Sequence, residues 1–125
     1  STAKEHMTNA TSLLGNAGEA AAATWYEHRG YEVLARNWRN RRGEIDLVVL
    51  APTGALVIVE VKTRRTTAKG SGFDAVTPVK QQRLRRLALE FVAAQSKWFD
   101  TIRFDVAVVT PMAGELCVEV LEAAY

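Results

Sequence analysis

Two aliphatic runs joined by a short turn constrain the fold of this chain more than any other feature. Residues 43–50 read Gly-Glu-Ile-Asp-Leu-Val-Val-Leu, and residues 56–62 read Leu-Val-Ile-Val-Glu-Val-Lys, with a Pro-Thr-Gly turn between them. Such runs of Val, Ile and Leu around a Gly/Pro turn predict an antiparallel hairpin of buried strands. The charged residues that interrupt the hairpin are Asp46, Glu60 and Lys62. Burying an ion among aliphatic side chains costs several kcal/mol without a partner or a metal, so all three need compensation.

The charged residues of the hairpin have a chemistry in common. Side chains alternate along a strand, so Glu60 and Lys62 are expected on one face. Two carboxylates on adjacent strands suit Mg²⁺ or Mn²⁺, hard cations that prefer oxygen ligands. A lysine beside them can stabilise charge on a phosphate or on an attacking water. The simpler alternative is a structural carboxylate–lysine ion pair, which leaves one carboxylate over.

Basic residues are concentrated in the middle of the chain. Between Arg36 and Arg86 there are twelve Lys or Arg against four Asp or Glu, whereas the rest of the chain has four against ten. A basic centre around acids in apolar strands is what a site for a polyanion and a metal requires. A solvated charged surface is the alternative. We expect nucleic acid, most simply DNA, to contact the following bases: Arg39, Arg41, Arg42, Arg64, Arg65, Lys69, Lys80 and Arg83.

The segments before the hairpin predict a helix, a strand and a loop. Apolar residues recur with helical spacing from Leu13 to His28, and Gly30 follows as a stop. Residues 31–36 are expected to form a short strand, and residues 37–43 a basic loop anchored by Trp38. Stacking of Trp38 on a nucleic-acid base is the alternative role.

The segments after the hairpin predict a loop, a helix and two strands. Residues 63–76 are rich in Gly, Lys and Arg, which predicts a mobile basic loop. Thr77 and Pro78 then have the types expected at the N-cap and first position of a helix, whose buried face we expect to be Leu84, Leu87, Ala88 and Phe91. Residues 102–110 are expected to form a strand that Pro111 and Gly114 end, and residues 116–121 an edge strand.

Length and composition favour one domain in a reducing compartment. We expect a single domain over residues 11–125, with residues 1–10 a disordered remnant of a tag because His6-Met7 resembles a cloning junction. No apolar run approaches the roughly 18 residues of a membrane span. The single cysteine, Cys117, cannot form an internal disulfide, which suits the cytoplasm, and is expected to be a small buried apolar residue.

The hairpin residues also carry a resemblance to a known superfamily. Asp46, thirteen intervening residues and then Glu60-Val61-Lys62 resemble the motif of the PD-(D/E)xK, or restriction-endonuclease-like, nucleases. The chain as a whole resembles the YraN-like bacterial family, which is related to archaeal Holliday-junction resolvases. The matching segments, in order, are residues 15–19 (Gly-Asn-Ala-Gly-Glu), 43–46 (Gly-Glu-Ile-Asp), 59–62 (Val-Glu-Val-Lys) and 103–106 (Arg-Phe-Asp-Val).

This resemblance implies an α/β fold with a restriction-endonuclease-like core, in which helices flank a mixed central sheet. It implies that Glu19, which periodicity alone would leave solvated, completes a catalytic set with Asp46, Glu60 and Lys62. The metal, Mg²⁺ or Mn²⁺, would be held by Asp46, Glu60 and the Val61 carbonyl. Gln81 fits a further polar position weakly, and an ion pair with Arg103 is at least as good an explanation of Asp105 as catalysis.

The function that the resemblance implies is metal-dependent hydrolysis of phosphodiester bonds in DNA, in particular branched or structured DNA. Junction resolution by relatives implies a homodimer. The alternatives from other classes are a nucleic-acid-binding module on the same fold without turnover, and a structural adaptor whose charges only pair with one another. The adaptor would show neither metal binding nor salt-dependent affinity for DNA.

Overall fold

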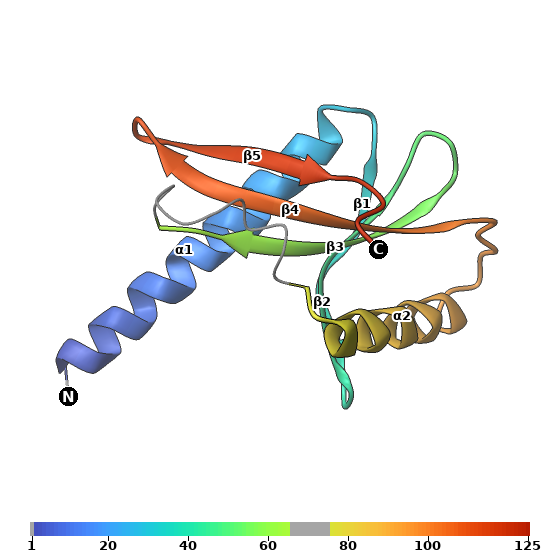
Figure 1. Ribbon diagram of the computed structural model, residues 1–125, viewed down its shortest axis with the longest axis horizontal. Coiled ribbons are helices and arrows are strands. Elements are labelled where there is room, and N and C mark those ends of the chain that lie inside the picture. Colours follow the sequence, from blue (N-terminus) through green and yellow to red (C-terminus); the bar gives the residue numbers. More distant parts are fainter. Residues whose placement is uncertain (1, 66–75) are drawn as a thin grey trace.

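The computed structural model describes residues 2–65 and 76–125, and of residues 2–13 it describes the backbone alone. Within these ranges the elements are α1 (Thr2–Glu27), β1 (Glu32–Asn40), β2 (Gly43–Leu50), β3 (Leu56–Thr63), α2 (Pro78–Ala93), β4 (Ile102–Met112) and β5 (Glu115–Leu121). The strands form one sheet in the order β1-β2-β3-β4-β5 (Figure 1). The β3–β4 pair is parallel and the other pairs are antiparallel. The predicted α/β fold with a mixed, helix-flanked sheet is confirmed and is compatible with a restriction-endonuclease-like core.

The two helices cover opposite faces of the sheet (Figure 1). Successive side chains of β3 point to opposite faces, so Leu56 and Ile58 pack in the core beneath α2, while Val57 and Val59 pack in the core beneath α1. This strand is therefore buried on both sides, which is why its sequence is a nearly continuous aliphatic run.

Helix α2 forms as predicted from its first residues. Thr77 is the N-cap, and its Oγ1 accepts a hydrogen bond of 3.2 Å from the backbone N–H of Lys80. Pro78 follows at the start of the helix, where its missing N–H removes no helical hydrogen bond. The buried residues of the helix are Leu84, Leu87, Ala88 and Phe91, which confirms the predicted face.

The predictions for the first third of the chain need two corrections. Helix α1 begins at Thr2, well before the predicted start at Leu13. Strand β1 runs to Asn40 and joins β2 through a tight turn, so the predicted loop over residues 37–43 is mostly strand. Trp38 lies edge-to-face on Phe91 at 5.5 Å, and this packing, with the β2 pairing, outweighs the polarity of the segment. The anchor role of Trp38 is confirmed.

The C-terminal hairpin also differs in detail from its prediction. β4 continues through Pro111, which lies opposite Leu116, and ends at Met112. β5 is an edge strand, as predicted. Cys117 is exposed, so its predicted burial was wrong. Alternate side chains of this edge strand face solvent, whereas Val118 and Val120 pack against the α1-side core.

Two predictions fall partly outside these residues. Most of the predicted mobile loop, including Lys69, belongs to residues 66–75, which lie outside the described part of the chain. The assignment of residues 1–10 as a tag remnant stays a prediction. Among the described residues, no helix combines the length and the apolar character that a membrane span requires.

Candidate functional site

The candidate site lies where the pairing of β2 with β3 ends. These strands pair from Leu50–Leu56 to Leu47–Val59. Beyond that pair, β2 continues beside β1 and β3 continues beside β4. Asp46 and Glu60 are the first residues after the end of the pairing. Two carboxylates from aliphatic strands therefore reach a place where the sheet is open.

Asp46 lies half-buried at this opening. Its Oδ2 accepts a hydrogen bond of 2.8 Å from the backbone N–H of Val61. Burial, followed by the nearby Glu60 carboxylate, raises the pKa of Asp46 to about 7, although the Val61 N–H opposes this shift. Glu19 and Glu44 raise the pKa further. The cause is thus an excess of negative charge in a partly desolvated place.

Glu60 is buried, with 7% of its surface exposed. Its Oε1 forms an ion pair with the ammonium group of Lys80, from the first turn of α2. Lys80 was predicted to contact nucleic acid, and here it lies inside the site. The sequence marks the start of α2 at Thr77 but not where the helix docks, so this partner of Glu60 was missed.

Glu19 reaches the site because α1 crosses β3 closely at the preceding residue. A Cβ added to Gly18 would lie 2.0 Å from Oγ1 of Thr63, so the crossing requires glycine. Glu19 Oε2 is buried and has no hydrogen-bond partner among the described residues. The solvated position favoured by helical periodicity therefore does not hold for this oxygen. The resemblance, not the periodicity, was the signal that singled out Glu19.

Lys62 shares the face of Glu60, as predicted. It pairs with Val108 and Glu60 pairs with Val106, and both valines belong to the core beneath α2. The Lys62 side chain is half-buried. The site thus contains two lysines, one on the strand and one on the helix.

The carboxylate oxygens of the site are the type of ligand that a hard divalent cation prefers, although Asp46 and Glu60 are bonded to other groups of the protein. Within the described residues, no three acidic, His or Cys side chains are arranged to ligate one metal ion. Glu60 bonds to Lys80 and Asp46 bonds to the Val61 N–H. The buried, unpartnered oxygen of Glu19 and the raised pKa of Asp46 nevertheless mark negative charge that the protein leaves uncompensated. An Mg²⁺ or Mn²⁺ ion would supply that compensation.

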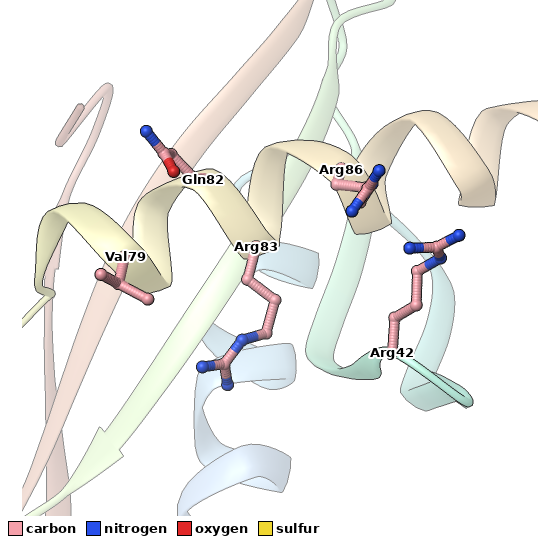
Figure 2. Close-up of a pocket in the computed structure, with 5 residues that line it drawn as sticks. All are labelled: Arg42, Val79, Gln82, Arg83 and Arg86. Atoms are coloured by element: carbon pink, nitrogen blue, oxygen red, sulfur yellow. The ribbon is translucent and has the colours of Figure 1, made fainter.

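A cationic groove runs between α2 and the β1–β2 turn. Figure 2 shows its lining residues, with the Arg42 side chain extending from the β1–β2 turn toward α2. The volume of the groove is about 530 Å³. The residues that line it are Arg42, Val79, Gln82, Arg83 and Arg86. Arg86 was not among the predicted nucleic-acid contacts. Three guanidinium groups along one groove suit a row of phosphates.

Some of the predicted contacts also have carboxylate partners. Arg42 Nε lies 2.7 Å from Glu90 Oε1, and Arg39 Nη2 lies 3.3 Å from Glu44 Oε1. Arg41 is exposed in the β1–β2 turn, and Arg64 and Arg65 directly follow β3. The predicted basic surface is therefore partly neutralised near the turn and at Lys80, whereas Arg83 and Arg86 form no ion pair with a carboxylate among the described residues.

The segment Arg103-Phe104-Asp105-Val106 has a structural role. Asp105 is fully buried and accepts hydrogen bonds from Nε and Nη2 of Arg103, each 2.9 Å, from the Tyr26 hydroxyl at 2.7 Å and from the Ala123 N–H at 3.1 Å. The ion pair expected for Asp105 is thus present. Burial and Asp105 together raise the pKa of Tyr26 far above its ordinary value. Gln81 is also structural in this conformation, because its Nε2 donates to the Val76 carbonyl at 3.0 Å.

Comparison with known proteins relates the chain to one protein family. Residues 18–109 match the family described as "Uncharacterised protein family UPF0102". A UPF0102 protein of Bifidobacterium longum is 38% identical over 113 residues, which cover 89% of this chain and 91% of that protein. A UPF0102 protein of Nocardia farcinica is 48% identical over 81% of this chain and 79% of its own length. One of Anaeromyxobacter dehalogenans is 42% identical over 90% and 83%. The matched range includes every residue of the candidate site.

Proposed function

The chain belongs to the uncharacterised protein family UPF0102, and we propose that it is a metal-dependent nuclease that hydrolyses phosphodiester bonds in DNA. The observation that supports this proposal most is the uncompensated negative charge where β2 and β3 part, seen in the orphan oxygen of Glu19 and the raised pKa of Asp46. Such an arrangement costs stability, and buried unsatisfied groups of this kind are common at functional sites. Its neighbourhood is cationic, which suits a phosphate backbone.

The metal would be held by the carboxylates of Asp46 and Glu60 and by the carbonyl of Val61, with the Glu19 carboxylate adding negative charge beside them. When bound, Mg²⁺ or Mn²⁺ would polarise a phosphodiester and lower the pKa of a water. Lys62, on the face of Glu60, would stabilise the negative charge that develops on the phosphate. Arg83 and Arg86 would hold the phosphate backbone beside the site. Branched or otherwise structured DNA is the substrate class we propose, and a homodimer the form that acts on it.

Calorimetry with Mn²⁺ tests the metal site. We expect binding by the wild-type protein and loss of binding in Asp46→Asn and Glu60→Gln. Glu44→Gln is the matched control, because Glu44 is exposed on the same strand and pairs with Arg39. Binding that is unchanged in both Asp46→Asn and Glu60→Gln would remove the site.

Substitution of Lys62 tests the reaction. In Lys62→Met, Mn²⁺-dependent cleavage of DNA should fall by roughly two or more powers of ten while DNA affinity and thermal stability hold, because the lysine acts on the reacting phosphate. Lys97→Met, at an exposed position after α2, controls for the change of residue type. A large loss of stability with undiminished cleavage per folded molecule would instead make Lys62 a structural residue. Substrates of several architectures, assayed together, identify the preferred DNA.

A second candidate function is a nucleic-acid-binding module without turnover. The observation that favours it is the Lys80–Glu60 ion pair, which already compensates one of the carboxylates. This module would bind DNA with an affinity that falls steeply with salt, and Arg83→Ala with Arg86→Ala would make that dependence shallower. It would show no cleavage with Mg²⁺ or Mn²⁺. A flat salt response would contradict both functions and favour the adaptor.

A further inference from the structure

We propose that Lys80 sets the metal affinity of this site, because its ammonium group and a divalent cation compete for Glu60. This inference rests on the proposed function and adds a positioning residue from α2 to it. The direct observation is the ion pair between Lys80 Nζ and Glu60 Oε1. A cation that takes Glu60 as a ligand must displace the lysine from that oxygen.

The position of Lys80 is fixed by the start of α2. Its backbone N–H donates to Thr77 Oγ1 at 3.2 Å, and the next residue, Gln81, donates through Nε2 to the Val76 carbonyl at 3.0 Å. Leu84 and Leu87, four and seven residues after Lys80, lie on the same side of the helix and are buried in the core. These contacts fix the rotation of α2 about its axis, so the fold directs the Lys80 side chain toward Glu60.

The two partners differ in their freedom to move. The side chain of Glu60 is 9% exposed, whereas that of Lys80 is 37% exposed. Glu60 is held among the strands and needs a compensating charge. Lys80 has a long flexible side chain and can extend into solvent without breaking the core. Exchange of the cation at Glu60 therefore moves the lysine and leaves the carboxylate in place.

The charges around Glu60 explain why a metal can win this competition. An ammonium group brings one positive charge to one carboxylate, while Asp46 and Glu19 remain uncompensated. A divalent cation brings two charges, so it can take oxygen ligands from Glu60 and Asp46 and also offset the nearby charge of Glu19. The displaced lysine lies one turn before Arg83, which lines the cationic groove. Metal binding would thus add a positive charge to the side of the site where the phosphates would pass.

Calorimetric titration with Mn²⁺, in the absence of DNA, tests the competition. We expect Lys80→Met to bind Mn²⁺ at least tenfold more tightly than the wild-type protein. Lys80→Arg, which keeps the positive charge on Glu60, should stay within about threefold of the wild type. The matched control is Arg83→Met, which removes one positive charge a turn further along α2. The comparison of Lys80→Met with Arg83→Met separates direct competition from the general effect of net charge.

Thermal unfolding provides a second measurement on the same proteins. Lys80→Met should be less stable than the wild type in the presence of a chelator, because it leaves Glu60 uncompensated, and saturating Mn²⁺ should remove the difference. Lys80→Gln, a polar substitution, serves if the methionine variant does not fold. In chelator, the double variant Lys80→Gln/Glu60→Gln should be more stable than Lys80→Gln alone, because it no longer has an uncompensated carboxylate. It should also lose the tight binding of Mn²⁺.

The outcomes separate this inference from the proposed function. If wild-type binding depends on Asp46 but Lys80→Met and Lys80→Gln bind no more tightly than Arg83→Met, the competition is overturned and the metal site stands. If neither the wild type nor any Lys80 variant binds Mn²⁺, both proposals fall. Tighter binding in the Lys80 variants alone, restored to the wild-type value by arginine, supports the competition.

Discussion

In the described part of the chain, two groups of acidic side chains are wholly or partly withdrawn from solvent, and they differ in how fully protein donors satisfy them. On β4, Asp105 receives four hydrogen bonds, two of them from the guanidinium of Arg103. At the opening between β2 and β3, Asp46 is hydrogen-bonded to one backbone N–H, Glu60 forms an ion pair with one lysine, and Glu19 leaves an oxygen without a partner among the described residues. Helix α1 contributes to both, with Tyr26 as a donor to Asp105 and Glu19 as one more negative charge near Asp46.

If the proposed function holds, the difference separates a structural charge from one that binds a ligand. A buried carboxylate with all its bonds made stabilises a particular arrangement of elements, here α1, β4 and the segment after β5. Carboxylates that repel one another cost stability and are retained for what they can bind. The two groups should therefore respond oppositely when their charges are altered.

The largest effect is expected from removing the partner of Asp105. Arg103→Met would leave a fully buried carboxylate without its counter-ion, and the free energy of unfolding should fall by about 3–5 kcal/mol. Urea unfolding measures the loss. Glu122→Gln is the control, because Glu122 is the exposed partner of Arg103 at 3.7 Å, and should cost less than about 1 kcal/mol. Equal effects of the two substitutions would show that the Asp105 group is not a structural one.

An effect of opposite sign, and at most of comparable size, is expected at Asp46. Its folded pKa of about 7 lies above the unfolded value of about 3.9, so the folded protein keeps a proton that the unfolded chain releases. This contribution to stability is complete below about pH 4 and is lost as the pH rises to about 7, at up to about 1.4 kcal/mol per pH unit. Asp46→Asn should remove this slope and exceed the wild type in stability at pH 8 in the presence of a chelator.

Chemical unfolding from pH 4 to pH 8 tests the sign. Glu32→Gln, an exposed acid at the start of β1, should keep the wild-type slope. Parallel pH profiles for the wild type and Asp46→Asn would mean that Asp46 is as well satisfied as Asp105, and the contrast between the two groups would disappear. Saturating Mn²⁺ should remove the loss of wild-type stability at high pH, because the metal favours the ionised carboxylate of Asp46.

The smallest of these effects comes from a pair of glycines in α1. Gly18→Ala places a methyl group against Thr63, so we expect a loss of about 1–3 kcal/mol and weaker Mn²⁺ binding as Glu19 moves away. Gly15→Ala meets no atom within 4 Å and should stabilise the helix by up to about 1 kcal/mol. Thermal unfolding and calorimetry on both variants measure the two effects. A gain of stability with intact binding in Gly18→Ala would show that the close crossing does not position Glu19.

Local patterns determined much of the fold in advance. The central hairpin was predictable because aliphatic runs and a Gly/Pro turn require no distant partner to be recognised. The start and buried face of α2 were predictable because the Thr77-Pro78 cap and the apolar spacing are local as well. The acids of the hairpin and Lys62 were identifiable because charge in a buried strand is conspicuous. Glu19 was identified by resemblance alone.

Only the tertiary structure decided which polar groups meet. The extension of β1 over basic residues depends on Trp38 reaching Phe91. The exposure of Cys117 depends on which face of β5 is covered, because the neighbouring Val118 packs against the core beneath α1 and Cys117 points to the other face. The ion pair of Glu60 with Lys80 depends on how α2 docks, and the approach of Glu19 depends on a crossing that Gly18 permits. The physical reason is common to all four: periodicity specifies which face of an element is buried, whereas contacts between elements depend on where those faces pack against each other.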